Sequence, residues 1–456
     1  MNAIIISALW GVLMMYMGFM DKNNKATLGF AILGVAAVLA SNWLEYLGVP
    51  FFSIETNGML IYDRFGLMFS NVVLFCTLLY FILSGDTIVK TTKSPSDHFA
   101  LIFFILAGSS VLAGFKSLLM LFIGIEIVSI PLYVLAGSDK SNLKSNEAAL
   151  KYFLMGSFST GLMLMGIALL YGDAGTFYTE PMQMGLAVLS PMKSIGIILL
   201  LASMSFKVSA APFHFWTPDV YDGTPTVFTS FMATIVKSIA FFAFLRLFDG
   251  AFGKFQQDWK LLVAVIAAAT LIIGNFTAVF QQSVKRMLSY SSIAQAGFML
   301  LGVYTLNSFA KQGMVLYFAA YSIATIGIFA VLAQLKDHSI EYFNGLAKSQ
   351  PWVALSLLIC LLSLAGIPLT AGFFGKYYML LAVLKDGQML WLAILAILCA
   401  AVSIYYYFRV IQAIYFKAPS EGVTFEFSSR FTIMLLLNSL LLIALGIHPD
   451  WLTTLL

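Results

Sequence analysis

Charged residues are scarce in this chain. Asp, Glu, Lys and Arg make up 10% of its 456 residues, whereas hydrophobic residues make up 61% and the mean hydropathy is +0.93. Soluble domains are roughly one quarter charged, so this chain carries more apolar surface than a soluble core can bury. The composition therefore predicts a protein that resides in a lipid bilayer.

Cysteine and histidine are also rare, and neither forms clusters. The three cysteines and four histidines stand singly: Cys76, Cys360, Cys399, His98, His214, His338 and His448. Zinc and iron–sulfur sites need closely spaced ligands, and the sequence has no Gly-rich phosphate loop beside a strand–helix pattern. We therefore expect no disulfide framework, redox centre, nucleotide site or other cofactor in this chain. The net charge of +4 fits loop lysines beside lipid headgroups and indicates no nucleic-acid partner.

Apolar stretches of about 20 residues, the length that crosses roughly 30 Å of hydrocarbon, recur along the chain. They predict fourteen transmembrane helices, at 2–20, 27–45, 66–84, 99–114, 117–136, 148–171, 194–216, 225–247, 259–280, 287–307, 314–335, 352–384, 389–414 and 431–447. The first lacks the basic start and cleavage site of a signal peptide, so we expect it to be retained. No loop is long and polar enough for a soluble domain. The sequence thus predicts one all-α polytopic membrane domain over 1–456.

Helix breakers interrupt the seventh and twelfth predicted helices. Pro212 follows Lys207 in the seventh, and the twelfth, which is too long for one straight crossing, contains Gly366 and Pro368. We therefore expect both helices to be discontinuous.

The two breaks also suggest an internal repeat, because each ends a run of three complete helices and a fourth interrupted one. We expect two five-helix repeats, at 97–250 and 259–414, with peripheral helices over 1–96 and a last helix at 431–447. Since five is an odd number, the second repeat must be inverted in the membrane. Many transporters place ion sites between such inverted repeats, at the unwound turns of discontinuous helices.

Basic loop residues predict the orientation. With the amino terminus outside, thirteen Lys and Arg fall in inside loops and eight in outside loops. Cytoplasmic loops are usually the more basic ones, so we expect both termini on the outer, periplasmic side.

Four lysines lie three or more residues inside predicted helices: Lys151, Lys207, Lys237 and Lys376. Lys207 and Lys237 stand ten or more residues from the nearest polar turn, about 15 Å deep, where a charge costs at least ~2.5–3.5 kcal/mol. Lys376 follows the break at Pro368, where unwound backbone needs polar neighbours or water. We expect these three to be functional. For Lys151, near its helix end, a structural role with the ammonium reaching the headgroups is an equal alternative.

Glu126 is the only acidic residue deep within a predicted helix. A nearby lysine would favour its ionised form, so a Glu126–Lys207 pair is the simplest arrangement. The alternative is a lone protonated glutamate that hydrogen-bonds to helix backbone.

Four stretches carry a resemblance to a known family: "FKVSAAPFHFWTPDVYDGTPTVFTSFMATIVKSIAFF", "KRMLSYSSIAQAGF", "EAALKYFLMGSFSTGLMLMGIALLYG" and "LAGIPLTAGFFGKYYML". Over nearly the whole chain the sequence resembles the antiporter-like subunits of respiratory complex I, and among them the N subunits. "WTPDVYDGTPT" is similar to subunit N, and Lys376 argues against subunit M, which is expected to have glutamate there. The chain also ends soon after its last predicted helix, whereas subunit L continues into a long lateral helix.

The resemblance implies a proton-translocating subunit of NADH:quinone oxidoreductase, in the inner membrane of a bacterium. Its partners would be subunits M, K and J and, indirectly, the hydrophilic arm that holds the redox centres. Glu126 and Lys207 then resemble the pair of the first half-channel. Lys237 resembles the connecting lysine, and Lys376 the terminal lysine of the second half-channel.

One position departs from the family. The tenth helix usually carries a histidine where this chain has Gln295, and an amide does not titrate. His214 stands just past Pro212, and we expect it to line the cytoplasmic end, although an interfacial histidine fits equally well. Two other classes stay open: a subunit of a multisubunit sodium/proton antiporter, and a scaffold subunit, which would have no reason to keep midplane lysines.

Overall fold

The fold is helical throughout the part of the chain that the structure describes, with no named strand. The computed structural model describes all residues except 22–23, 25, 185–189, 420–423 and 456. The α-helices are α1 (Asn2–Met20), α2 (Thr27–Tyr46), α3 (Arg64–Thr91), α4 (Pro95–Gly114), α5 (Leu118–Ala136), α6 (Leu143–Ala174), α7 (Thr179–Met184), α8 (Pro191–Lys207), α9 (Trp216–Gly223), α10 (Thr226–Phe231), α11 (Lys237–Phe252), α12 (Gln256–Val279), α13 (Val284–Thr305), α14 (Ser308–Leu332), α15 (Leu346–Ser349), α16 (Pro351–Ala365), α17 (Ala371–Asp386), α18 (Leu390–Phe416), α19 (Ser429–Ile447) and α20 (Asp450–Thr453). A π-helical turn, η1 (Met232–Val236), joins α10 to α11, and η2 (Gly253–Phe255) and η3 (Ile340–Phe343) are 3₁₀ turns.

Ten helical segments of the described chain are long and apolar enough to cross a membrane, so the protein is an integral membrane protein. One of them, Thr226–Val279, combines the predicted eighth and ninth helices. Each of the fourteen predicted ranges overlaps a helix, but α8, α13, α16 and α17 are too short or too polar to count among the ten. The number fourteen therefore stays a prediction.

Both predicted breaks are confirmed. The first separates α8, which ends at Lys207, from α9, which begins at Trp216. The second separates α16, which ends at Ala365, from α17, which begins at Ala371. The protein thus contains two short segments of non-helical backbone between paired half-helices.

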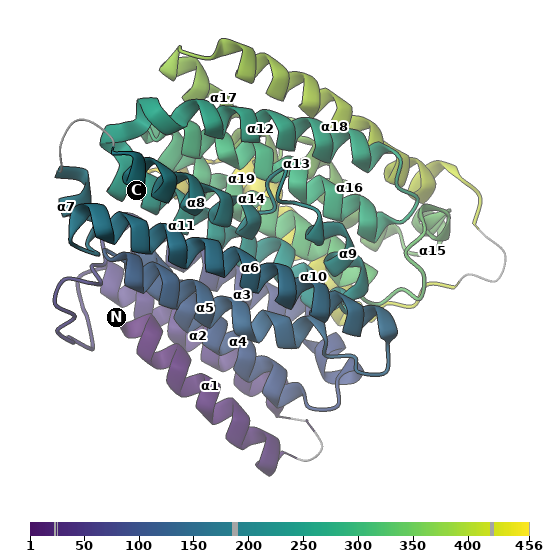
Figure 1. The fold of residues 1–456 in the computed structure, drawn as a ribbon. Helices are drawn as coiled ribbons and strands as arrows, with labels where there is room; N and C mark the ends of the chain where they lie inside the picture. Colours follow the sequence, from purple (N-terminus) through teal and green to yellow (C-terminus); the bar gives the residue numbers. More distant parts are fainter. Residues whose placement is uncertain (22–23, 25, 185–189, 420–423, 456) are drawn as a thin grey trace.

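The helices pack around α14. In Figure 1, α1 lies at one edge of the bundle and α17 and α18 at the opposite edge, with α14 between them. The most apolar 18-residue stretch of α14 is wholly buried, whereas only 22% of the corresponding stretch of α1 is. α14 and the neighbouring α13 and α17 therefore form the interior in which the candidate site lies.

Three lysines that the orientation count assigns to loops lie instead at the starts of helices and are buried: Lys193, Lys260 and Lys285. Lys260 forms an ion pair of 2.5 Å with Asp386, and Lys285 donates to the carbonyl oxygens of Asp222 and Thr224 at 2.9 and 2.7 Å. Placing them in loops was wrong, because hydropathy does not distinguish a lysine that caps a neighbouring helix from one in solvent.

Candidate functional site

Glu126 and Lys207 lie on neighbouring helices but do not form the predicted direct pair. Lys207, the last residue of α8, donates from Nζ to Ser129 Oγ at 2.9 Å. Glu126 Oε1 accepts a hydrogen bond of 2.8 Å from Thr160 Oγ1 on α6. Ser129 follows Glu126 by three residues on α5 and therefore lies on the same helix face. A serine hydroxyl thus stands beside the ammonium group where the sequence predicts the carboxylate.

The backbone of the first break is held by side chains from other elements. Trp216 Nε1 donates to the carbonyl oxygen of Phe206 at 3.2 Å, and the amide of Ala211 donates to Thr270 Oγ1 at 2.9 Å. These bonds satisfy polar groups that a continuous helix would have paired internally. Lys207 consequently ends its helix at a fixed position.

His214 lies within the same break and is buried. Its ring packs against Phe215, with 4.5 Å between ring centroids, and its Nδ1 atom has no hydrogen-bond partner among the described residues. His214 therefore has one buried ring nitrogen that is not hydrogen-bonded to the described residues. Its role at the cytoplasmic end stays a prediction.

Lys237 follows the π-helical turn η1 directly and is 2% exposed. Its Nζ donates to both the carbonyl oxygen and Oγ of Ser292 on α13, each at 3.0 Å. A π-helical turn inserts a residue into a helix and often marks a functional site. Here it determines the direction in which Lys237 leaves its helix.

Lys376 lies on α17 and folds back over the second break. Its Nζ donates to the carbonyl oxygens of Leu364 and Ala365, both at 2.9 Å. These are terminal carbonyls of α16, which no helical partner satisfies and whose dipole favours a cation. Gly366 makes the approach possible: its φ is +84°, and a Cβ atom there would lie 2.8 Å from Lys376 Cδ.

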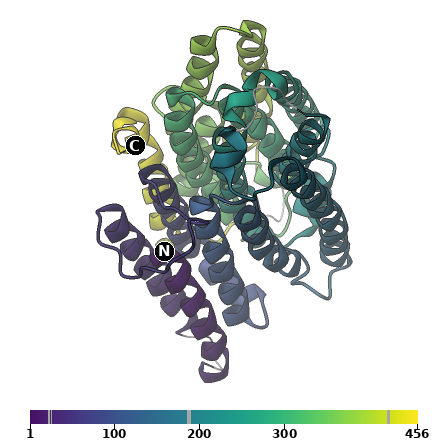
Figure 2. The same cartoon turned by 60° about the vertical axis from the view of Figure 1, so that its left-hand side comes forward.

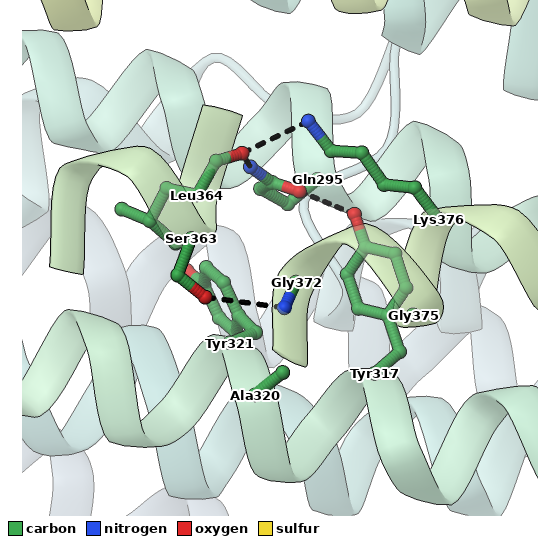
Figure 3. A pocket seen from close by; sticks show the side chains of 9 residues that line it. All are labelled: Gln295, Tyr317, Ala320, Tyr321, Ser363, Leu364, Gly372, Gly375 and Lys376. Atoms are coloured by element: carbon green, nitrogen blue, oxygen red, sulfur yellow. Dashed lines mark hydrogen bonds between the residues drawn. The ribbon is translucent and has the colours of Figure 1, made fainter. Parts of the chain in front are cut away.

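Gln295 lines a small cavity together with Lys376 (Figure 3). Its Oε1 accepts a hydrogen bond from the hydroxyl of Tyr317, and its Nε2 donates to the carbonyl oxygen of Leu364 at 3.1 Å and to the hydroxyl of Tyr407 at 3.2 Å. The cavity measures about 10 Å³, and the polar groups of Gln295, Tyr317 and Lys376 reach it among mostly apolar atoms. This volume is at the lower limit for one water molecule.

Hydroxyl groups nearly connect Lys237 to this cavity along α13. Lys237 bonds to Ser292, whereas the preceding residue, Ser291, bonds to the Tyr407 hydroxyl at 2.5 Å. Tyr407 in turn accepts from Gln295. The two serine side chains are not hydrogen-bonded to each other, so the connection is interrupted at this one step. The sequence analysis did not find Tyr317 and Tyr407, since tyrosines on apolar helices are indistinguishable from packing residues until the helices are placed.

Lys151 lies away from these buried groups, at a charged surface. Its side chain is 41% exposed and pairs with Glu147 at 2.7 Å and with Asp219 at 2.9 Å. Asp219 also pairs with Arg286 at 3.2 Å. Burial raises the pKa of Asp219, but its hydrogen bonds and charge interactions with Lys151 and Arg286 outweigh this and hold the pKa below its usual range. The structure therefore places Lys151 in a surface ion-pair network.

The described residues contain no group of three or more His, Cys, Asp or Glu placed to hold a metal ion. The three cysteines are buried free thiols.

Comparisons with known proteins identify the family of the chain. Residues 116–403 match the family described as NADH:quinone oxidoreductase/Mrp antiporter, TM. The chain is 40% identical over 455 residues to the NADH-quinone oxidoreductase subunit N of Cytophaga hutchinsonii, covering 99% of this chain and 98% of that protein.

Solved structures show the same fold. A chain of respiratory complex I from Thermus thermophilus with bound aureothin superposes with a TM-score of 0.84 at 33% identity, covering 99% of this chain and 98% of the other. A chain of the Mrp complex from Dietzia superposes with a TM-score of 0.86 at 19% identity, covering 99% and 95%, and so shows the fold alone. The chain therefore belongs to the family of NADH-quinone oxidoreductase N subunits.

Proposed function

We propose that this chain is a proton-translocating membrane subunit of an NADH:quinone oxidoreductase and contains no redox centre of its own. NADH oxidation and quinone reduction take place in other subunits, and this chain moves protons through its buried glutamate, lysines and intervening water. Its nearest partners are the other membrane subunits, M, K and J. The protein lies in the bacterial inner membrane with both termini on the periplasmic side.

The burial of two lysines without a counter-charge carries the proposal. Lys237 and Lys376 are 2% and 7% exposed, and the hydrogen bonds of both go to neutral oxygens. Neither has a carboxylate within 4.0 Å among the described residues. A buried charge without a partner destabilises the folded state, so a contribution to stability does not explain these two ammonium groups. The same groups can gain or lose a proton when a carboxylate or water molecule approaches.

Lys207 and Glu126 form the corresponding site of the first repeat, 97–250, and Lys376 that of the second, 259–414. Ser129 keeps the ammonium of Lys207 close to Glu126 without a permanent ion pair. A small helix movement at the break can then bring the two charges together or apart. Coupling to redox chemistry would act through this change of population between paired and separated states.

A sodium/proton antiporter is the alternative function, since the matched family includes Mrp antiporters. Sodium is a hard cation that needs oxygen ligands, and nearby ammonium groups repel it. The polar interior of this chain is lined by Lys237 and Lys376, which favours protons over sodium ions.

Replacing Lys207 by alanine in the assembled complex tests the proposal. NADH oxidation by an artificial acceptor should stay normal, whereas quinone-linked turnover and proton pumping should fall together. Lys254→Ala, at an exposed lysine on η2, is the matched control and should leave both rates unchanged. Wild-type pumping by a correctly assembled Lys207→Ala complex would disprove the proposed role. Sodium-dependent proton exchange without NADH would favour the antiporter.

A further inference from the structure

A deep apolar groove opens where the two ends of the chain meet. It measures about 710 Å³ and is lined by residues of α2, α3, α14, α19 and α20. Met68, Ala319 and Ile323 are buried and form its floor, whereas the exposed Trp43 and Trp451 stand at its rim. Figure 2 shows the yellow carboxyl-terminal helices beside the purple amino-terminal ones. The groove thus lies on the flank of the bundle, away from the buried lysines.

The lining of the groove is apolar. Apart from the two tryptophans at the rim, Asn71 is the one described lining residue with a polar side chain. The amide oxygen of Asn71 accepts a hydrogen bond of 2.9 Å from Asn42. A groove of this size falls within the range that encloses a drug-sized ligand, so it can hold a hydrocarbon chain. In a bilayer the neighbours of such a groove are lipid acyl chains.

The positive charge of Arg64 lies beside one end of the groove, next to the aromatic rim. The guanidinium of Arg64 lies 5.3 Å from the centre of the Tyr46 ring, and that ring lies 5.4 Å from the ring of Trp43. Tyr46 also fixes the carboxyl-terminal segment, because its hydroxyl donates to the carbonyl oxygen of Leu455 at 2.6 Å. Arg64, the aromatic rim and the chain end therefore meet at one place.

Asp63, next to Arg64 in the sequence, and Glu45, next to Tyr46, do not compensate Arg64, because each pairs with another cation. Glu45 pairs with the amino terminus at 2.6 Å, and Asp63 pairs with Arg246 at 3.1 Å. Arg64 is exposed and has no carboxylate within 4.0 Å among the described residues. Its planar donors are free to bind an anion from outside the chain, and phosphate is the group that arginine binds in a bidentate manner.

We propose that this groove binds an anionic phospholipid. The phosphate lies at Arg64, the glycerol region beside Trp43 and Tyr46, and one acyl chain along the floor formed by Met68, Ala319 and Ile323. Tryptophan and tyrosine prefer the headgroup level of a membrane, which places the rim at the depth of the lipid phosphate. The lipid would fill the flank between the first and last helices of the chain.

Native mass spectrometry of the full-length chain in detergent tests the site. The probes are phosphatidylglycerol and phosphatidylcholine with identical acyl chains. A basic residue near a membrane surface contributes about 1 kcal/mol to anionic-lipid binding, so the wild type should bind phosphatidylglycerol about fivefold more tightly. Arg64→Gln should abolish this preference. Arg430→Gln, at an exposed arginine in the first turn of α19, is the control and should retain it.

A second variant tests the groove itself. Ala40 is exposed and lines the groove, so Ala40→Leu narrows it without disturbing a buried contact, and should weaken the binding of both lipids. Equal binding of both lipids by the wild type, or unchanged binding by Arg64→Gln and Ala40→Leu, would overturn the proposal. Cryo-electron microscopy of the assembled complex supplies the last test: two-chain lipid density in the groove supports the proposal, and a helix of another subunit there contradicts it.

Discussion

Lys376 and Gln295 share one hydrogen-bond acceptor. The Nζ atom of Lys376 and the Nε2 atom of Gln295 both donate to the carbonyl oxygen of Leu364, at 2.9 and 3.1 Å (Figure 3). A carbonyl oxygen has two lone pairs, so both donors can be satisfied at once. If Lys376 moves or loses a proton, the bond of Gln295 to Leu364 changes with it. The unwound end of α16 thereby links a titratable residue to a non-titratable one.

Lys376 should need to release its proton and not merely carry a charge. Arginine keeps the charge but does not deprotonate in proteins, whereas histidine exchanges a proton near neutral pH. We expect Lys376→Arg to reduce proton pumping severely and Lys376→His to retain part of it. Proton uptake by reconstituted vesicles at equal assembly is the measurement. Normal pumping by the arginine variant would make Lys376 a structural counter-charge.

Proton pumping should require glycine at position 366, because a Cβ atom there would lie 2.8 Å from Lys376 Cδ. Alanine at its φ of +84° costs roughly 1–2 kcal/mol of backbone energy. Gly387, the control, has a φ of +72°, but a Cβ atom there would meet no other atom within 4 Å, so Gly387→Ala carries the backbone cost alone. We expect similar losses of thermal stability for both variants but a loss of pumping only for Gly366→Ala. Equal pumping by both would show that Lys376 tolerates displacement.

Ser129 should support the function of Lys207. Ser129→Ala removes the hydroxyl that Lys207 donates to, and hydrogen bonds to charged groups contribute about 1.5–3 kcal/mol. We expect a partial loss of pumping, smaller than that of Lys207→Ala, and recovery in Ser129→Thr. Ser84→Ala is the control, since Ser84 is buried on α3 with no hydrogen-bond partner among the described residues. If Ser129→Ala pumps normally, Lys207 relies on water instead.

Gln295 should act through its hydrogen bonds. In Gln295→Leu the buried Tyr317 hydroxyl loses its acceptor, at a cost of about 1–3 kcal/mol, whereas Gln295→His keeps one donor and one acceptor. We expect the histidine variant to pump and the leucine variant to fail. Asn438→Leu removes another buried amide, on α19, and controls for lost stability alone. Failure of the histidine variant would show that the amide geometry is essential.

The sequence predicted the helical membrane fold, both breaks and the burial of Lys237 and Lys376, because these depend on hydropathy and on proline and glycine along one chain. It did not predict the partners of these side chains. The bond between Lys237 and Ser292, for example, joins residues 55 positions apart, and depends on how α11 and α13 are rotated. For the same reason the contact of Lys207 with Ser129, the tyrosines around Gln295 and the surface ion pairs of Lys151 became visible only in the structure.

The number of residues in the π-helical turn before Lys237 controls the direction in which the Lys237 side chain points. Each residue rotates an α-helix by about 100°, so η1 sets the angular offset between α10 and α11 through its number of residues. Removing any one residue from Met232–Val236 would restore a regular helix and turn Lys237 away from Ser292 by about that angle. Insertions and deletions in this turn should therefore be selected against more strongly than most substitutions within it.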